Sequence, residues 1–131
     1  MRFCLCLVAL AAAALAAETL HGKLDLHEGQ PPILETAGHR KIALDGDETT
    51  RAVLGDLRVN GFEVEVRGHF TSPGNFLIDA SHTHSLLVRR DGHLKLITYW
   101  CDVCSIRAYT PGPCRCCQRE TTLDLRDPDE K

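Results

Sequence analysis

The chain has 131 residues, of which 44% are hydrophobic and 5% aromatic. Fifteen Lys and Arg stand against 18 Asp and Glu, which gives a formal net charge of −3 at pH 7, and there are seven cysteines. This length excludes a chain of several domains, and the composition excludes a coiled coil. A mildly acidic chain with few aromatic residues also lacks the basic surface and stacking platforms that nucleic-acid binding requires.

The first 17 residues predict a secretory signal peptide. Arg2 supplies a cationic start, an apolar run follows at positions 3–15, and small residues suited to a signal peptidase end the segment. The run is too short for a membrane span, which needs about 20 apolar residues. We therefore expect an exported protein, periplasmic or extracellular, with no stable membrane insertion after cleavage. Cys4 and Cys6 leave with the signal peptide, so five cysteines belong to the mature chain.

The first part of the mature chain predicts two extended stretches and one short helix. Positions 19–26 alternate apolar and polar side chains, which is the period of a half-buried strand. A second extended stretch covers positions 33–44 and is interrupted at Ala37-Gly38. Asp47 is a favourable N-cap because its carboxylate can accept from the free amides of a first helical turn. A short helix is therefore expected from there to about Gly55.

The following part predicts four further strands. The clearest has apolar and charged residues in strict alternation and is expected to end before Gly68. Asp91-Gly92 is a strong hairpin signal and is expected to join the last two strands. The four strands are expected at positions 62–67, from position 76 onward, at 85–88 and at 94–97.

Short strands, a lone small helix and glycine-rich turns predict a mainly β fold. We expect a small antiparallel barrel of the OB type, with a β-sandwich as the alternative. The barrel is expected to span residues 18–97. A cysteine-rich segment of zinc-ribbon or disulfide type follows at 98–120, and a charged tail at 121–131. The residues from Asp124 to Lys131 show no apolar pattern and are expected to fray.

The five mature cysteines fall into two groups that resemble the ligand pairs of a metal site. Each group contains a pair with a two-residue gap, which lets a tight turn direct both sulfurs at one ion. Two such turns can complete a tetrahedron of four thiolates. The Pro111-Gly112-Pro113 stretch between them supplies a chain reversal, although the nine-residue gap is shorter than in common two-pair zinc ribbons. The predicted metal ligands, with zinc as the first candidate ion, are Cys101, Cys104, Cys114 and Cys117, with Cys116 as an alternative.

Two other states of these cysteines remain open from the sequence. An exported small domain lies where thiols oxidise, so the groups could instead be joined by two disulfides that leave one free thiol. The stretch from Trp100 to Cys104 also resembles the Trp-Cys-x-x-Cys motif of thioredoxins and could act as a thiol-disulfide oxidoreductase. Positions 105–112 form a poor helix sequence, however, and Asp102 disfavours a thiolate. The sequence therefore favours a non-enzymatic role.

Two histidines offer a weaker second metal site. His82 and His84 lie two positions apart, so on a strand they would project from one face and could share an ion. Two surface histidines without a ligand are the favoured interpretation. Trp100, next to Cys101, is expected to pack over the cysteine site.

The C-terminal sequence contains two stretches that together form one motif, Tyr99-Trp100-Cys101-Asp102-Val103-Cys104-Ser105-Ile106-Arg107 and Tyr109-Thr110-Pro111-Gly112-Pro113-Cys114-Arg115-Cys116-Cys117-Gln118. This motif resembles one found in a family of short exported bacterial proteins, of acidobacterial type. Stretches that begin at Gly46 and Gly61 are similar to that family too, so the resemblance covers most of the mature chain. It implies a protein of the bacterial cell envelope, and it brings no activity with it. The expected partners are a metal ion and an unidentified protein or small ligand of the envelope.

Overall fold

The computed structural model describes residues 17–128. The expected signal peptide, apart from its last residue, and the first two cysteines lie outside the described residues. The strands are β1 (Glu18–Asp25), β2 (Ile33–Glu35), β3 (Lys41–Asp45), β4 (Glu63–Ser72), β5 (Asn75–Ile78), β6 (Leu86–Arg90), β7 (His93–Cys101), β8 (Ile106–Ala108) and β9 (Thr122–Arg126). The helices are α1 (Glu48–Leu54), the 3-10 helix η1 (Leu57–Val59) and α2 (His82–Ser85).

Five strands close into a barrel. β1 pairs with β2, β2 with β3, β3 with β5, β5 with β4, and β4 with β1, so the order of strands returns to its start. This arrangement, with α1 between β3 and β4, confirms the expected OB-type barrel. One pair, β3 and β5, is parallel. Five strands cannot alternate in direction all the way round a closed ring, so one parallel pair is required.

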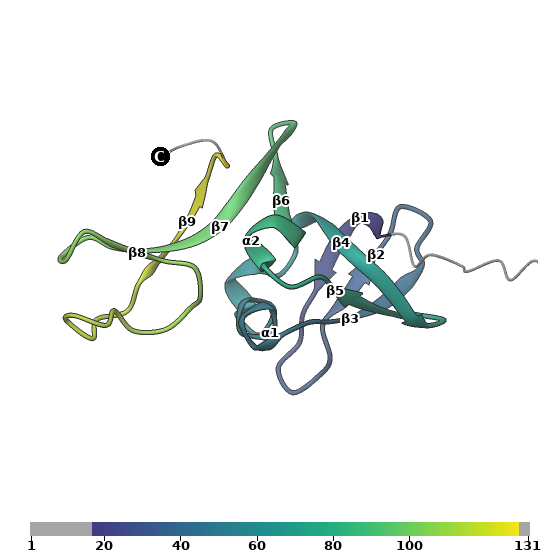
Figure 1. Cartoon of the computed structure of the whole chain (residues 1–131), viewed down its shortest axis with the longest axis horizontal. Helices are drawn as coiled ribbons and strands as arrows, with labels where there is room; N and C mark the ends of the chain where they lie inside the picture. The colour runs from purple at the N-terminus through teal and green to yellow at the C-terminus, as the bar shows by residue number, and fades with distance from the viewer. Residues whose placement is uncertain (1–16, 129–131) are drawn as a thin grey trace, which may run out of the picture.

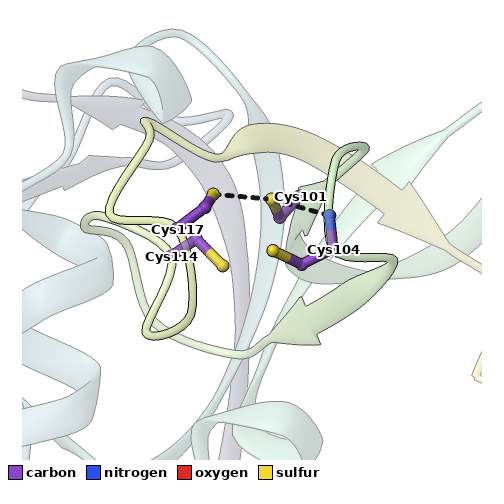
Figure 2. A group of neighbouring side chains, drawn as sticks. All are labelled: Cys101, Cys104, Cys114 and Cys117. Carbon is purple, nitrogen blue, oxygen red and sulfur yellow. Dashed lines mark hydrogen bonds between the residues drawn. The ribbon is translucent and has the colours of Figure 1, made fainter.

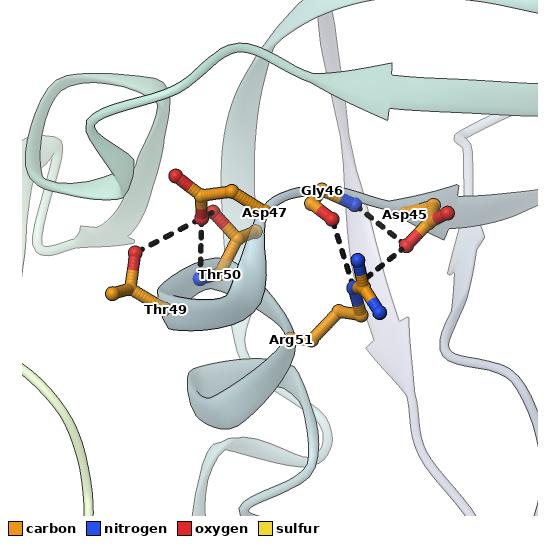
Figure 3. Close-up of polar contacts among 6 residues, drawn as sticks. All are labelled: Asp45, Gly46, Asp47, Thr49, Thr50 and Arg51. Carbon is orange, nitrogen blue, oxygen red and sulfur yellow. Dashed lines mark hydrogen bonds and ion pairs between the residues drawn. The ribbon is translucent and has the colours of Figure 1, made fainter.

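Helix α1 begins where the sequence predicts it. The Asp47 carboxylate accepts from the backbone N–H of Thr50 and from both threonine hydroxyls of the first turn, at 2.8–2.9 Å (Figure 3). Arg51 reaches back to the carbonyl of Gly46 at 2.9 Å and so fixes the strand-to-helix turn. The helix ends at the cap Gly55.

Strand β4 is longer than the sequence predicts. The expectation that it ends before Gly68 is wrong, because this glycine lies inside the strand, opposite Ile78 of β5. A Cβ atom at Gly68 would lie 1.9 Å from the carbonyl oxygen of Leu77. Glycine therefore permits the close approach of β4 and β5 rather than ending a strand.

The chain leaves the barrel after β5 and then adds β6 alongside β4. β6 pairs with the part of β4 that precedes its contact with β5, and α2 lies between β5 and β6 in sequence. The expected hairpin is present between β6 and β7, since Asp91 and Gly92 have φ of 53° and 77°. β7 then continues across the expected boundary after residue 97 and forms a second sheet with β8 and β9 (Figure 1).

The second sheet shares the apolar core of the barrel. Ile97 and Tyr99 of β7 are buried in the same cluster as the barrel residues, and Leu123 and Leu125 of β9 pack against it. The sequence predicts fraying from Asp124 onward. This prediction is wrong for residues 124–126, because they form the end of β9. Residues 129–131 lie outside the described residues. No helix among residues 17–128 has the length and apolar character needed to cross a membrane.

Candidate metal centre

Two turns carry the four cysteines predicted as ligands. Cys101 ends β7 and Cys104 lies in the turn before β8, whereas Cys114 and Cys117 lie in the stretch between β8 and β9. The four sulfur atoms all lie within 4.8 Å of one another. Figure 2 shows them facing a common centre between the two turns. We call these four residues the cysteine cluster.

The spacing of the sulfurs suits a metal cage and not a disulfide. A tetrahedral zinc site with Zn–S bonds near 2.3 Å has S–S edges of about 3.8 Å, whereas a disulfide needs about 2.05 Å. The sulfurs of Cys101 and Cys117 lie 3.5 Å apart. All five cysteines among residues 17–128 are free thiols. Of the states left open by the sequence, the geometry therefore favours a site that can hold a metal ion.

The two turns have the same local design. In each, the sulfur of the first cysteine accepts a backbone N–H from within the turn, from Cys104 to Cys101 at 3.5 Å and from Cys116 to Cys114 at 3.4 Å. The residue after the second cysteine has a positive φ in both turns, 53° at Ser105 and 60° at Gln118. Positive φ is uncommon outside glycine and is often found at functional sites. The repeated conformation thus directs both cysteines of each turn to one point.

Hydrogen bonds set the pKa values of two thiols in opposite directions. Backbone N–H groups of Cys117 and Cys116 lower the pKa of Cys114 to about 7, because they stabilise the thiolate. The neighbouring thiol of Cys116, followed by burial, raises the pKa of Cys104 well above its ordinary value. Cys114 therefore loses its proton more readily than Cys104 does.

The cluster has a buried side and an accessible side. Cys101 and Cys114 are 2% and 4% exposed, whereas Cys104 and Cys117 are half-buried. Cys116, predicted as the alternative ligand, is exposed, and its sulfur is not among the four that lie within 4.8 Å of one another. In sequence it directly precedes the ligand Cys117 in the second turn.

The two histidines predicted as a weak second site do not share a face. They lie on the single helical turn α2 and not on a strand, from which both would have projected to one face. His82 is buried and His84 is exposed. The ring of His82 contacts the hydroxyl of Thr49 at 3.1 Å and the carbonyl of Tyr109 at 2.7 Å, so both of its nitrogens are already engaged. His82 thus joins α1 to the chain that leads into the second cysteine turn.

Trp100 lies away from the cysteine cluster. Successive side chains on a strand point to opposite faces, so Trp100 and Cys101 of β7 face apart. The guanidinium of Arg107 lies 4.8 Å from the centre of the Trp100 ring, and it also donates to Thr98 and Asp124. The expectation that Trp100 covers the cysteines is therefore wrong. The ring instead packs against the guanidinium of Arg107 on the other face of β7.

The likeness to thioredoxins does not extend to the structure. Residues 102–105 form a turn that leads directly into β8, so Cys104 does not lie in a helix. Without that helix, its amide dipoles cannot stabilise a thiolate at Cys101 in the manner of thioredoxins.

The sequence alone did not reveal a second connection, between the barrel and the cysteine segment at residues 102–121. Arg58 of η1 donates to the carbonyl of Thr121 at 2.9 Å, and Asp56 holds its guanidinium at 2.9 Å. The same guanidinium lies 5.3 Å from the centre of the Tyr99 ring, whose pKa is raised by burial. No sequence signal marks this contact, because the acceptor is a backbone carbonyl 63 positions away.

A separate hollow lies on the barrel. It has a volume of about 820 Å³ and is bordered by the β1–β2 loop, α1 and the β4–β5 hairpin. Its apolar wall includes Leu44, Leu54 and Phe76, and its rim includes Asp45 and Arg51. The volume is in the range of small-molecule pockets.

The fold and the cluster together define an OB-type barrel module that bears a four-cysteine site able to hold a metal ion. Comparison of the chain with protein-family models, with curated proteins and with solved structures found no match.

Proposed function

We propose that the protein is an exported, non-enzymatic barrel module whose cysteine cluster binds a zinc ion. The observation that carries this proposal is the approach of four sulfurs from two like turns to within 4.8 Å of one another. Thiolates are soft ligands that suit zinc, and zinc accepts tetrahedral coordination without a penalty from its d-electrons.

The role of this zinc is to order the end of the chain. A site closed by four cysteines has no coordination position for water or substrate, so it stabilises structure and does not catalyse. Within residues 102–120 a single residue, Cys114, is buried. Metal ligation supplies the stabilisation that hydrophobic burial does not provide there.

Export is supported by the N-terminal sequence and by the resemblance to short exported bacterial proteins. The start lacks a twin arginine, which favours export as an unfolded chain, so the ion would be acquired in the periplasm or outside the cell. The hollow beside α1 is the part of the barrel that best suits a small ligand of the envelope, because an apolar wall meets a charged rim there.

Elemental analysis of the protein purified from a bacterial periplasm tests the metal site. We expect about one zinc per chain, whereas a content below roughly 0.2 per chain, with few free sulfhydryls, would overturn the proposal. Thiol titration after metal removal distinguishes the disulfide-stapled alternative. Four or five free sulfhydryls support the metal site, and one supports disulfides.

A further inference from the structure

Cys101 and Cys117 bring the two cysteine turns into contact. Their sulfur atoms lie 3.5 Å apart although the residues are 16 positions apart in the chain, and Figure 2 marks the contact with a dashed line. A disulfide has an S–S length of about 2.05 Å, so the two sulfurs need to approach by only about 1.5 Å to bond. Such a bond would tie the second turn to the end of β7.

The two cysteines of this pair differ in accessibility. Cys101 is 2% exposed, whereas Cys117 is half-buried, so a small oxidant in solution reaches Cys117 and is kept from Cys101. The backbone N–H of Cys104 donates to the sulfur of Cys101 at 3.5 Å and holds it in place. An accessible cysteine beside a second, resolving cysteine is the arrangement that converts oxidation into a disulfide. The pair therefore has a sulfur that an oxidant can reach and a buried partner that can complete the bond.

The barrel holds the second turn in place without using the sulfurs. The ring of His82 donates to the carbonyl of Tyr109 at 2.7 Å before the turn, and Arg58 donates to the carbonyl of Thr121 at 2.9 Å after it. Neither contact involves a cysteine, so oxidation of the sulfurs leaves both intact. The second turn therefore stays beside the end of β7, which favours a bond within the chain over a bond to another molecule.

We propose that the cysteine cluster is a redox switch that releases its zinc ion when a peroxide joins Cys101 to Cys117. This inference rests on the proposed zinc site and adds its regulation. An exported protein works in a compartment where thiols oxidise and disulfides persist. The disulfide removes two of the four thiolates, and Cys104 and Cys114 alone do not complete a tetrahedral site, so the ion leaves.

The reaction consumes one hydrogen peroxide for each disulfide. The zinc-bound thiolate of Cys117 attacks one oxygen of the peroxide, the O–O bond breaks, and the sulfur becomes a sulfenic acid as hydroxide leaves. The thiolate of Cys101 then attacks the sulfur of Cys117, so that the S–S bond forms and a second hydroxide leaves. Both hydroxides take a proton from solvent and become water. Each sulfur loses one electron, each peroxide oxygen gains one, and the metal keeps its charge.

Zinc release under peroxide tests the switch. The protein purified from the periplasm is reduced, loaded with zinc without oxygen and treated with hydrogen peroxide, while a colorimetric indicator follows the released zinc and the remaining thiols are titrated. Mass spectrometry maps the disulfide after digestion with trypsin and with a protease that cuts before aspartate, which separates Cys101 from Cys104 at Asp102. Cys116→Ser is the matched control, because it keeps the four ligands and leaves Cys117 as the one cysteine of its tryptic peptide.

We expect the parent protein and Cys116→Ser to release about one zinc per chain as two thiols are lost, with a cross-link between Cys101 and Cys117. Dithiothreitol and fresh zinc should restore the loaded form. Cys117→His keeps a zinc ligand without an oxidisable sulfur, so its release should be about tenfold slower. A cross-link between any other pair, release without a disulfide, or release from Cys117→His at the parental rate would overturn the proposal.

Zinc content measured before the peroxide is added separates this proposal from the one it rests on. Zinc that stays bound in excess peroxide would refute the switch and leave the zinc site standing. Absence of zinc from the reduced, zinc-treated parent protein would refute the zinc site itself. If Cys117→His binds no zinc, the cross-link mapped in Cys116→Ser decides the proposal.

Discussion

The barrel and the cysteine segment, residues 102–121, differ in how many side chains they bury. The barrel buries large apolar side chains completely, among them Leu34, Val66 and Phe76. In the cysteine segment most side chains are exposed or half-buried, and a cysteine, Cys114, is among the few buried there. Hydrophobic burial is non-directional and tolerates variation in shape, whereas metal ligation fixes a few atoms in one geometry. Hydrophobic burial is therefore suited to building a scaffold, and metal ligation is suited to building a binding site.

Two polar contacts join these regions. His82 connects α1 to the carbonyl of Tyr109, and Arg58 connects η1 to the carbonyl of Thr121. The two carbonyls lie on either side of the second cysteine turn, so the barrel positions the entry and the exit of this turn. Substitutions in each region and at the contacts between them can show how independent the two are.

Loss of the proposed zinc ion should have the largest effect. Binding of structural zinc is worth about 10–16 kcal/mol in zinc-finger peptides, and that energy is used to order the chain. In Cys114→Ser we expect no stoichiometric zinc, loss of amide protection in residues 102–121, and retained protection in β1 to β5. Hydrogen exchange with mass spectrometry measures this pattern. Equal loss of protection in the barrel strands would show that the two regions are one cooperative unit.

A cavity in the barrel core should rank second. Phe76 is 1% exposed and its ring meets that of Phe70 edge-on, with centres 5.1 Å apart. We expect Phe76→Ala to lower the free energy of unfolding by about 3–5 kcal/mol in urea titrations. Leu57→Ala, at a half-exposed position, should cost much less. The folded fraction of Phe76→Ala should still bind one zinc. Failure to bind zinc would show that the cysteine cluster depends on the packing of the barrel core.

Removal of the contact between the regions should have an intermediate effect. His82→Ala leaves the carbonyl of Tyr109 without its donor, which we expect to cost about 1–3 kcal/mol of stability. The amides of Tyr109, Thr110 and Gly112 should also exchange faster. His84→Ala is the matched control, because this exposed histidine lies two positions away and should change stability by no more than about 0.5 kcal/mol. Equal effects of the two variants would refute the role of His82.

The helix cap should have the smallest effect, and that effect should depend on pH. Asp47→Ala removes the cap of α1, at a cost of about 1 kcal/mol at pH 7, whereas Asp47→Asn can retain the cap. The backbone N–H of Thr50, followed by the threonine hydroxyls, lowers the pKa of Asp47 below its ordinary 3.8. The charged cap therefore stabilises the fold above about pH 4 and loses this contribution as the pH falls through the lowered pKa. Urea titrations at pH 7 and pH 2.5 should show the difference between Asp47→Ala and the parent protein shrinking at the lower pH.

The barrel could be predicted because its signals are local. Alternation of side chains in β1 and β4, the cap at Asp47 and the turn at Asp91-Gly92 each depend on neighbouring residues. The approach of the four cysteines followed from the spacing of two pairs. The reach of β4 past Gly68 could not be predicted, because the close approach of β5 is set by the closure of the barrel.

The missed features depend on distant partners. Strand β9 could not be predicted, because only two leucines alternate with Asp124 and Arg126. The strand forms because it pairs with β7. The helical turn at His82 has no pattern of its own and is held by contacts to α1 and to the cysteine segment. The positive φ at Ser105 and Gln118 gave no signal because neither residue is glycine.

The pairing of β7 with both β8 and β9 makes the second cysteine turn part of a loop that the strands of the second sheet do not include. Tyr99 of β7 lies opposite both Ala108 of β8 and Leu123 of β9, so the chain leaves the second sheet after β8 and re-enters it at β9 beside the same residue. The stretch between β8 and β9, which carries the second cysteine turn, is an excursion from that sheet. The entropy of closing such a loop rises only slowly with its length. Natural or engineered variation in the length of this excursion can therefore alter the cage without shifting the register of the strands beneath it.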